Sequence, residues 1–232
     1  RSRKTSSLRS FYKYLTAIVE YFEKNPAEKL STPKVKKRHP VYLTVDEATQ
    51  LIHTAAQQEN KFFRYRDVAI LVTFLTTGIR LSELCGMNVG SIRDHQFNVI
   101  GKGDKERTVY MTESCNEALR LYLSIRPIVD GENALFLSSR KKRMSTRAVQ
   151  HRIDHFLREA GFDTSVYSTH KLRHTAATLM YKEGVDIRTL QRILGHSSLA
   201  TTQIYTHVED DMARKAVEKN PLAGMDVTKL EQ

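Results

Sequence analysis

The chain has 232 residues, which is enough for one domain of ordinary size with part of a second but too few for two full domains. Its 37 Lys and Arg residues outnumber its 26 Asp and Glu residues, and the resulting net charge of +11 favours a polyanionic partner, of which nucleic acid is the common one. No apolar run approaches the ~18 residues of a spanning helix, and the basic N-terminal stretch lacks the apolar core of a signal peptide, so composition argues against a membrane or secreted protein.

The N-terminal stretch RSRKTSSLRSFYKYL predicts an amphipathic helix that continues to about Lys24. Three of the five prolines follow at positions 26, 33 and 40, together with five basic residues between Lys29 and Arg38, which is typical of an extended linker. We therefore expect a boundary near Ser31. Residues 1–30 would be the last helix of one domain with the start of the linker, and residues 31–232 would form a second domain.

From Thr44 onward the pattern predicts mostly helices. The residues TVDE offer an N-cap at Thr44 and a capping-box acid at Glu47. The stretch RDVAILVTFLTTG is apolar almost all round and predicts a central buried helix closed by Gly78. In QFNVIGKGDKERTVYM, apolar and polar residues alternate on both sides of a glycine-rich centre, which predicts a β-hairpin. Five further helices are expected in TESCNEALRLYLSIRP, STRAVQHRIDHFLREAG, STHKLRHTAATLMYKEG, DIRTLQRILG and SSLATTQIYTHVEDDMARKAV. The predicted fold class is α+β, mainly helical, with a small antiparallel sheet.

The stretch LGHSSLATTQIYTH places a histidine and a tyrosine in unusual positions. Gly195 would close one helix and the serines after it would cap the next, so His196 falls in a tight turn. Tyr205 lies about 100° off the apolar stripe of the second helix, at the edge of its buried face.

Two arginines are predicted at the ends of helices, where they could bind an anion. His170 and Arg173 share a face near a helix start, beside free backbone N–H groups. Arg80 directly follows the glycine-terminated buried helix, and Glu83, one turn on, could orient its guanidinium group toward a phosphate. The plainer interpretations are a solvated polar first turn and a surface Arg–Glu pair.

Basic residues elsewhere are candidates for contacts to a nucleic-acid backbone. Lys102 and Lys105 flank the predicted hairpin turn and could reach over a bound strand, although lysines there often only keep a sheet edge soluble. The other candidates lie in the linker and before and within the helix that starts near residue 146: Lys36, Lys37, Arg38, Arg140, Lys141, Lys142, Arg143 and Arg147.

Metal and serine chemistry are poorer interpretations. The histidines lack close partner ligands, and no Gly-x-Ser-x-Gly turn is present, so we expect no metal and no cofactor. Cys85 and Cys115 lie in apolar helical contexts and suggest neither a metal pair nor a disulfide, which fits a reducing, cytoplasmic compartment.

Four of these motifs, in this order, resemble those of tyrosine recombinases, also called the phage integrase family. TGIRLSEL is similar to the first-arginine motif, VIGKGDKER to the lysine hairpin, STHKLRHTAAT to the His-x-x-Arg motif, and LGHSSLATTQIYTH to a second histidine followed nine residues later by the nucleophilic tyrosine. The resemblance covers residues 40 to 208 and is nearest to the Xer-like and conjugative-transposon integrases.

The resemblance implies a role for each residue. Tyr205 would be the nucleophile, Arg80 and Arg173 the phosphate clamp, and Lys102 the general acid, with Lys105 as the alternative lysine. His170 and His196 would complete the site, and Glu83 matches an acidic supporting position. The implied reaction cleaves and rejoins double-stranded DNA at specific sites through a 3′-phosphotyrosyl bond, without a metal or ATP.

The resemblance also implies an N-terminal core-binding (SAM-like) domain, represented here by its last helix, and a homotetramer on DNA formed from monomers in solution, with the C-terminal tail helix passed to a neighbour. Two alternatives remain open: a type IB topoisomerase, which shares the chemistry but cuts alone, and a non-enzymatic regulator, since DIRTLQRILGHSS could be part of a helix-turn-helix.

Overall fold

The structure is a computed structural model that describes residues 2–31, 41–93, 95–100 and 106–195. Its internal contacts divide the chain into two units, residues 1–39 and residues 40–232.

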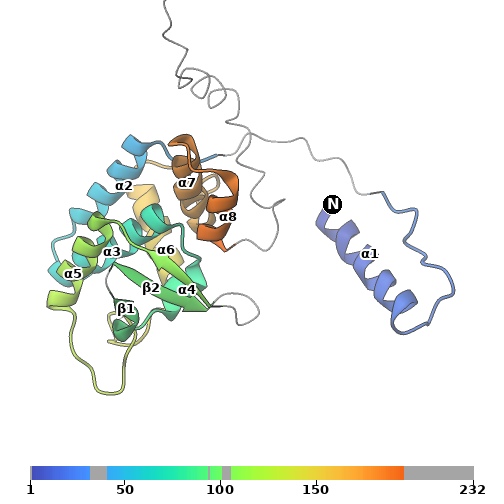
Figure 1. The fold of residues 1–232 in the computed structure, drawn as a ribbon, viewed down its shortest axis with the longest axis horizontal. Coiled ribbons are helices and arrows are strands. Elements are labelled where there is room, and N and C mark those ends of the chain that lie inside the picture. The colour runs from blue at the N-terminus through green and yellow to red at the C-terminus, as the bar shows by residue number, and fades with distance from the viewer. Residues whose placement is uncertain (1, 32–40, 94, 101–105, 196–232) are drawn as a thin grey trace, which may run out of the picture. The chain divides into compact units, whose positions relative to one another are not determined.

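The first unit contains one helix, α1 (Ser2–Ala17) (Figure 1). The prediction that this helix continues to about Lys24 is wrong. The chain leaves the helix because Glu20 takes a left-handed conformation, with a φ of 53°, and the Tyr21 amide then donates to the Leu15 carbonyl at 2.9 Å. This closure over residues 15–21 satisfies one of the last helical carbonyls and turns the chain away from the helix axis.

The second unit is built around α3 (Lys61–Thr77), which packs against α2 (Val45–Ala56) and α5 (Glu113–Ile125). The seven consecutive residues 69–75 are all buried, so this helix is covered on every side, as its apolar sequence predicts. It ends at Gly78, whose φ of 62° is left-handed.

Capping residues begin three of the helices where the sequence predicts them. Thr44 and Glu47 form the expected capping box at the start of α2, with the Thr44 amide donating to the Glu47 carboxylate at 2.7 Å. Thr112 caps α5, and Ser145 caps α6 (Thr146–Glu159) by accepting from the Ala148 amide at 3.1 Å.

The hairpin is confirmed and belongs to a three-stranded antiparallel sheet of order β1-β2-β3. The strands are β1 (Ile92–Arg93), β2 (Gln96–Ile100) and β3 (Glu106–Tyr110). In the β2–β3 pair Phe97 faces Val109, and both side chains are buried. The strand β1, which was not predicted, follows α4 (Leu81–Gly86) and a short 3-10 turn (Val89–Ser91).

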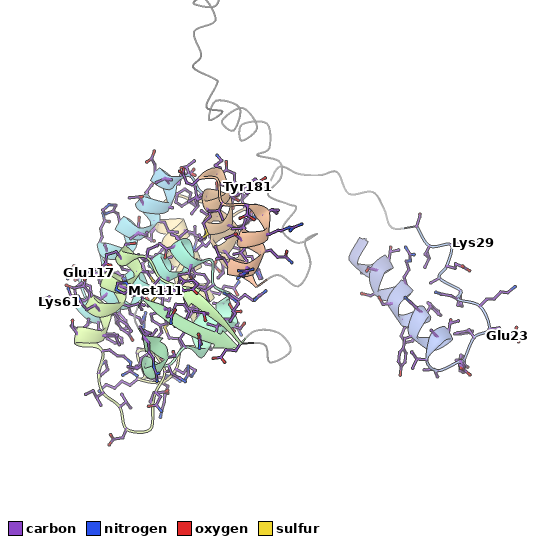
Figure 2. The ribbon with its side chains drawn as sticks, viewed as in Figure 1. Glu23, Lys29, Lys61, Met111, Glu117 and Tyr181 are labelled. Atoms are coloured by element: carbon purple, nitrogen blue, oxygen red, sulfur yellow. The ribbon has the colours of Figure 1, made fainter. Side chains whose placement is uncertain are left out.

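Two helices lie side by side at one end of this unit, α7 (Thr169–Lys182) and α8 (Ile187–Leu194) (Figure 1). A small apolar cluster joins them; Figure 2 labels one member, Tyr181, and the others are Ala177, Leu190 and Leu194. Gly195 ends α8 with a left-handed φ of 62°. The predicted helix that carries Tyr205, and the tail after it, lie outside the described residues.

One buried carboxylate ties α3 to α6. Asp67 is 1 % exposed and accepts from Arg66 and from Arg152, each with a nitrogen at 2.8 Å. The guanidinium group of Arg66 also donates to the Leu137 carbonyl at 3.0 Å. A shared carboxylate therefore fixes α6, and the loop before it, to the central helix.

Cys85 and Cys115 are both buried free thiols. Burial raises the pKa of the Cys85 thiol to about 11, although the positive charge of Arg143 opposes the rise. Across the described ranges, no helix is both long enough and apolar enough to cross a membrane.

Candidate active site

Arg80 is placed by the end of the central helix. The left-handed Gly78 turns the chain, Ile79 is fully buried, and Arg80 then begins α4 as its N-cap residue. Its guanidinium Nη1 donates to Glu83 Oε1 at 2.8 Å, and its backbone amide donates to Glu83 Oε2 at 2.9 Å. The contact predicted between Arg80 and Glu83 is therefore present, with the side chain of Glu83 only 2 % exposed.

Arg173, on α7, reaches the same place from the other side. Its Nη1 donates to the Gly78 carbonyl at 2.5 Å, and its Nη2 donates to the Leu194 carbonyl at 2.6 Å. Arg80 Nη2 donates to the next carbonyl, that of Gly195, at 2.5 Å. The two arginines predicted as a phosphate clamp thus converge on the C-terminal end of α8.

A third arginine, Arg107, joins them and was not predicted. It lies on β3, where its Nη2 donates to Glu83 Oε2 at 2.8 Å and its Nη1 donates to the Ile193 carbonyl at 2.8 Å. The signal was present in the strand alternation, because Arg107 falls on the same side as the buried Val109 and pairs with the buried Val99. An arginine on the inner side of a hairpin requires a buried acceptor.

We refer to Arg80, Arg107 and Arg173 with Glu83 as the arginine cluster. Three positive charges meet one negative charge, so the cluster carries excess positive charge where it reaches the surface. Burial alone would raise the pKa of Glu83, but hydrogen bonds from Arg80 and the charges of Arg107 and Arg80 lower it below its usual range. Burial also lowers the pKa of Arg107 from its usual high value. Glu83 therefore stays ionised at neutral pH, and the group suits an anionic ligand such as a phosphate.

Two glycines let the backbone approach the cluster. A Cβ at Gly195 would lie 2.7 Å from Arg107 Cδ, and one at Gly78 would lie 2.9 Å from Leu194 Cδ2. Both residues also have a φ of 62°, which side-chain-bearing residues rarely adopt. Glycine is needed at both positions for conformation and for space.

The histidines of α7 differ in environment. His170 is exposed in the first turn, one turn before Arg173, as the predicted shared face requires. His174 is 8 % exposed, and burial, aided by the charge of Lys171, lowers its pKa to about 4. His174 is therefore neutral at physiological pH, and His170 is the histidine accessible to a ligand.

Residues 41–212 match the phage integrase family. The chain belongs to this family. Tyrosine recombinase XerC of Caldanaerobacter subterraneus subsp. tengcongensis is 49 % identical over 96 % of this chain, which spans 63 % of that relative's length. XerC of Thermodesulfovibrio yellowstonii is 43 % identical over 90 % of this chain and 71 % of its own length.

Solved structures agree with the phage integrase assignment. The crystal structure of XerA recombinase is 33 % identical, with a TM-score of 0.68, over 92 % of this chain and 81 % of that one. The Tn1549 transposon integrase in complex with transposon right end DNA has a TM-score of 0.75 over 94 % of this chain and 78 % of that one, and at 23 % identity it shows the shared fold. The predicted α+β fold and the family resemblance are confirmed.

Several residues that the phage integrase resemblance assigns to the site lie outside the described residues. Lys102 and Lys105 fall between the ends of β2 and β3, His196 directly follows Gly195, and Tyr205 comes nine positions later. The linker residues Lys36, Lys37 and Arg38 are outside as well. Their roles remain predictions.

The predicted DNA-binding residues before and within α6 differ in their contacts. Arg140, Lys141 and Lys142, here called the basic loop, are exposed in a turn closed by the Ser138 amide donating to the Lys142 carbonyl at 2.8 Å. Arg143 is also exposed, but its guanidinium group donates to the Cys85 and Met87 carbonyls at 2.9 and 3.0 Å.

Arg147 is exposed in the first turn of α6, beside a hollow of about 570 Å³ that His151 and Arg152 also line. Among the described residues, no group of three or more His, Cys, Asp or Glu side chains could hold a metal ion.

Proposed function

We propose that the protein is a site-specific DNA recombinase that cleaves and rejoins strands of double-stranded DNA through a 3′-phosphotyrosyl bond to Tyr205. The observation that carries this proposal is the convergence of Arg80 and Arg173, from distant parts of the chain, on consecutive carbonyls at the end of α8. His196 directly follows that end. The relatives named as tyrosine recombinases support the same reaction.

The arginine cluster supplies what phosphodiester cleavage requires. A nucleophile approaches a phosphate only when the negative charge is neutralised, and guanidinium groups held by Glu83 and by backbone carbonyls need no reorganisation to do so. Tyrosine has an ordinary pKa near ~10, so the positive cluster, with His170 as the exposed proton acceptor, favours the phenolate of Tyr205.

The leaving 5′ oxygen takes a proton from Lys102, or from Lys105 if the turn brings that lysine closer. The phosphotyrosyl bond conserves the phosphodiester energy, and a different 5′-hydroxyl can then reverse the step. Strand exchange by this route needs neither a metal nor ATP.

We further propose that the basic loop, Arg147 and the linker residues 36–38 contact the DNA backbone. Arg143 is expected to hold the loop rather than to reach a phosphate, because its guanidinium group makes three internal hydrogen bonds, to the Cys85 and Met87 carbonyls and to Asn88 Oδ1. Residues 1–30 would be the end of an N-terminal core-binding domain that grips the opposite face of the duplex. The protein would act in the cytoplasm.

The assembly we propose is a homotetramer on two recombination sites, formed from monomers. A groove of about 280 Å³ between β3 and the α7–α8 pair, lined in part by Tyr110, Met180 and Ile193, supports this assembly by offering a place for the C-terminal helix of a neighbour. A type IB topoisomerase would cut alone, whereas a recombinase requires paired sites. A regulator would leave the arginine cluster without a role.

The proposal is tested by separating binding from cleavage. A duplex enriched from a random pool by binding to the wild-type chain serves as substrate, in EDTA. Arg80→Ala and Arg173→Ala should lower cleavage by several orders of magnitude and leave affinity nearly unchanged, because their contribution is to the transition state. Arg120→Ala, at an exposed pair on α5, is the charge-matched control. Equal losses of binding and cleavage would show that the two arginines only bind the DNA phosphates and do not act on the transition state.

A further inference from the structure

We propose that Arg107 is a positioning residue of the arginine cluster, which holds both Glu83 and the end of α8 so that Arg80 presents its guanidinium group to the scissile phosphate. This inference rests on the proposed function and deepens it, because it adds a residue to the site without assigning it a contact to DNA.

The first support is the bonding of Glu83. Its Oε1 accepts from the Arg80 side chain, while its Oε2 accepts from the Arg80 backbone amide and from Arg107 Nη2 at 2.8 Å. Without Arg107 the carboxylate keeps only bonds to Arg80 itself, and nothing else in these contacts ties it to the sheet. Arg107 is therefore the link that fixes the orientation of Glu83, and through it that of Arg80, relative to β3.

The second support is the end of α8. The three consecutive carbonyls of Ile193, Leu194 and Gly195 accept from Arg107, Arg173 and Arg80 respectively, at 2.8, 2.6 and 2.5 Å. Carbonyls at a helix C-terminus carry the negative end of the helix dipole, which suits guanidinium donors. Arg107 thus orders the same turn that Arg80 uses, directly before His196.

The surroundings of Arg107 exclude a direct contact with substrate. Its side chain is 14 % exposed, whereas that of Arg80 is 33 % exposed. Its Nε is buried and lies 2.8 Å from where a Cβ at Gly195 would stand, so the backbone of that glycine covers it. The group acts through Glu83 and α8.

The chain contains a matched site for comparison. Asp67 is shared by Arg66 and Arg152 in the same way that Glu83 is shared by Arg80 and Arg107, but it joins α3 to α6, away from the cluster. Replacing Arg107 or Arg152, both half-buried, by lysine keeps the positive charge. It removes the planar guanidinium group, which can donate to two acceptors at once. Arg152→Lys therefore controls for the loss of a shared buried ion pair.

The experiment measures single-turnover cleavage of the enriched duplex, nicked near the cleavage point, at saturating protein. Arg107→Lys should lower the first-order rate by about 10- to 100-fold, the effect of a small misplacement of a catalytic group, with affinity changed by less than about 3-fold. Arg152→Lys should leave the rate within about 3-fold. In a double-mutant cycle with Glu83→Gln, the combined loss should be smaller than the product of the single losses, because the two side chains act as a unit. The proposal would be overturned if Arg107→Lys cleaved at the wild-type rate. It would also be overturned if the rate loss of the double variant equalled the product of the two single losses.

A second measurement needs no activity. Rotation of the Arg80 guanidinium group about its Cζ–Nε bond, measured by NMR exchange in the free protein, should be several-fold faster in Arg107→Lys and unchanged in Arg152→Lys. Unchanged rotation in Arg107→Lys would contradict the positioning role even if cleavage were impaired. If the wild-type chain cleaved no DNA, the proposed function would be wrong. The rotation rate of the Arg80 guanidinium group would still test whether Arg107 positions Arg80.

Discussion

The Arg173 guanidinium group donates to the Gly78 carbonyl at 2.5 Å, across a separation of 95 residues. Gly78 ends the central buried helix α3, and Arg173 lies on α7. This single bond therefore joins the C-terminal end of α3 to the arginine cluster. The site is therefore part of the packed core, and substitutions at its supporting residues should affect stability and activity together.

Gly195→Ala should show this coupling. The substitution imposes a left-handed conformation on alanine, which costs about 1–2 kcal/mol, and places a Cβ 2.7 Å from Arg107 Cδ, where overpacking adds about 1–3 kcal/mol. Gly131→Ala is the matched control, since its φ is 71° but no atom lies within 4 Å of the added Cβ. Urea unfolding should show a clearly larger loss for Gly195→Ala, and DNA cleavage should fall only there. Equal losses in the two variants would show that Arg107 does not crowd this glycine.

Asp67→Ala should destabilise the fold strongly. It leaves Arg66, which is 3 % exposed, without its carboxylate, and removal of one partner from a buried pair costs about 3–5 kcal/mol. Glu117→Ala breaks an exposed pair with Arg120 and should leave the unfolding free energy unchanged. Chemical denaturation of the two variants checks this, and a small effect of Asp67→Ala would mean that Arg66 finds other acceptors.

His174 should make stability depend on pH. Below pH 6.5 the unfolded chain binds a proton at this residue, whereas the folded chain does not until about pH 4, so the unfolding free energy falls as the pH drops through this window. Between pH 7.5 and 5 the loss from His174 is about 2 kcal/mol. The difference in unfolding free energy between the wild type and His174→Gln should shift by this amount over that range. A constant difference would show that His174 titrates normally.

The basic loop should control the salt dependence of DNA binding. Replacing Arg140, Lys141 and Lys142 together by glutamine should lower the slope of log K against log salt by about 2–3, since each phosphate contact contributes about 0.9. Arg143→Gln should change the slope little, because that side chain bonds internal carbonyls. If the triple substitution leaves the slope unaltered, the basic loop is solvated and does not contact DNA phosphates.

The sequence predicted those features whose causes are local. The capping box of Thr44 and Glu47, the terminating glycines 78 and 195 and the hairpin depend on neighbouring residues, and all are present. The strand β1 has only two residues and thus no periodicity to detect. The end of α1 at Ala17 depends on a left-handed Glu20, which residue type alone does not indicate.

The site residues that belong to short sequence motifs were predicted. The site contacts that form only between distant parts of the chain were not. Arg80, Glu83 and Arg173 were recognised from short patterns, but their common acceptor, the end of α8, emerges only when distant helices pack. Arg107 has its acceptors on α4 and α8, far along the chain in both directions. The internal bonding of Arg143 was missed for the same reason.

Covalent capture of DNA by Tyr205 tests the proposed cleavage reaction without relying on any other residue. The wild-type chain, incubated in EDTA with the enriched duplex nicked near its cleavage point, should form a protein–DNA adduct through a 3′ phosphate, because the short 5′ fragment diffuses away and cannot religate. Peptide mapping should place the DNA on Tyr205, and Tyr205→Phe, which removes only the hydroxyl, should abolish the adduct without lowering stability. An adduct that persists in Tyr205→Phe, or that maps to Tyr167 near His170, would contradict the account.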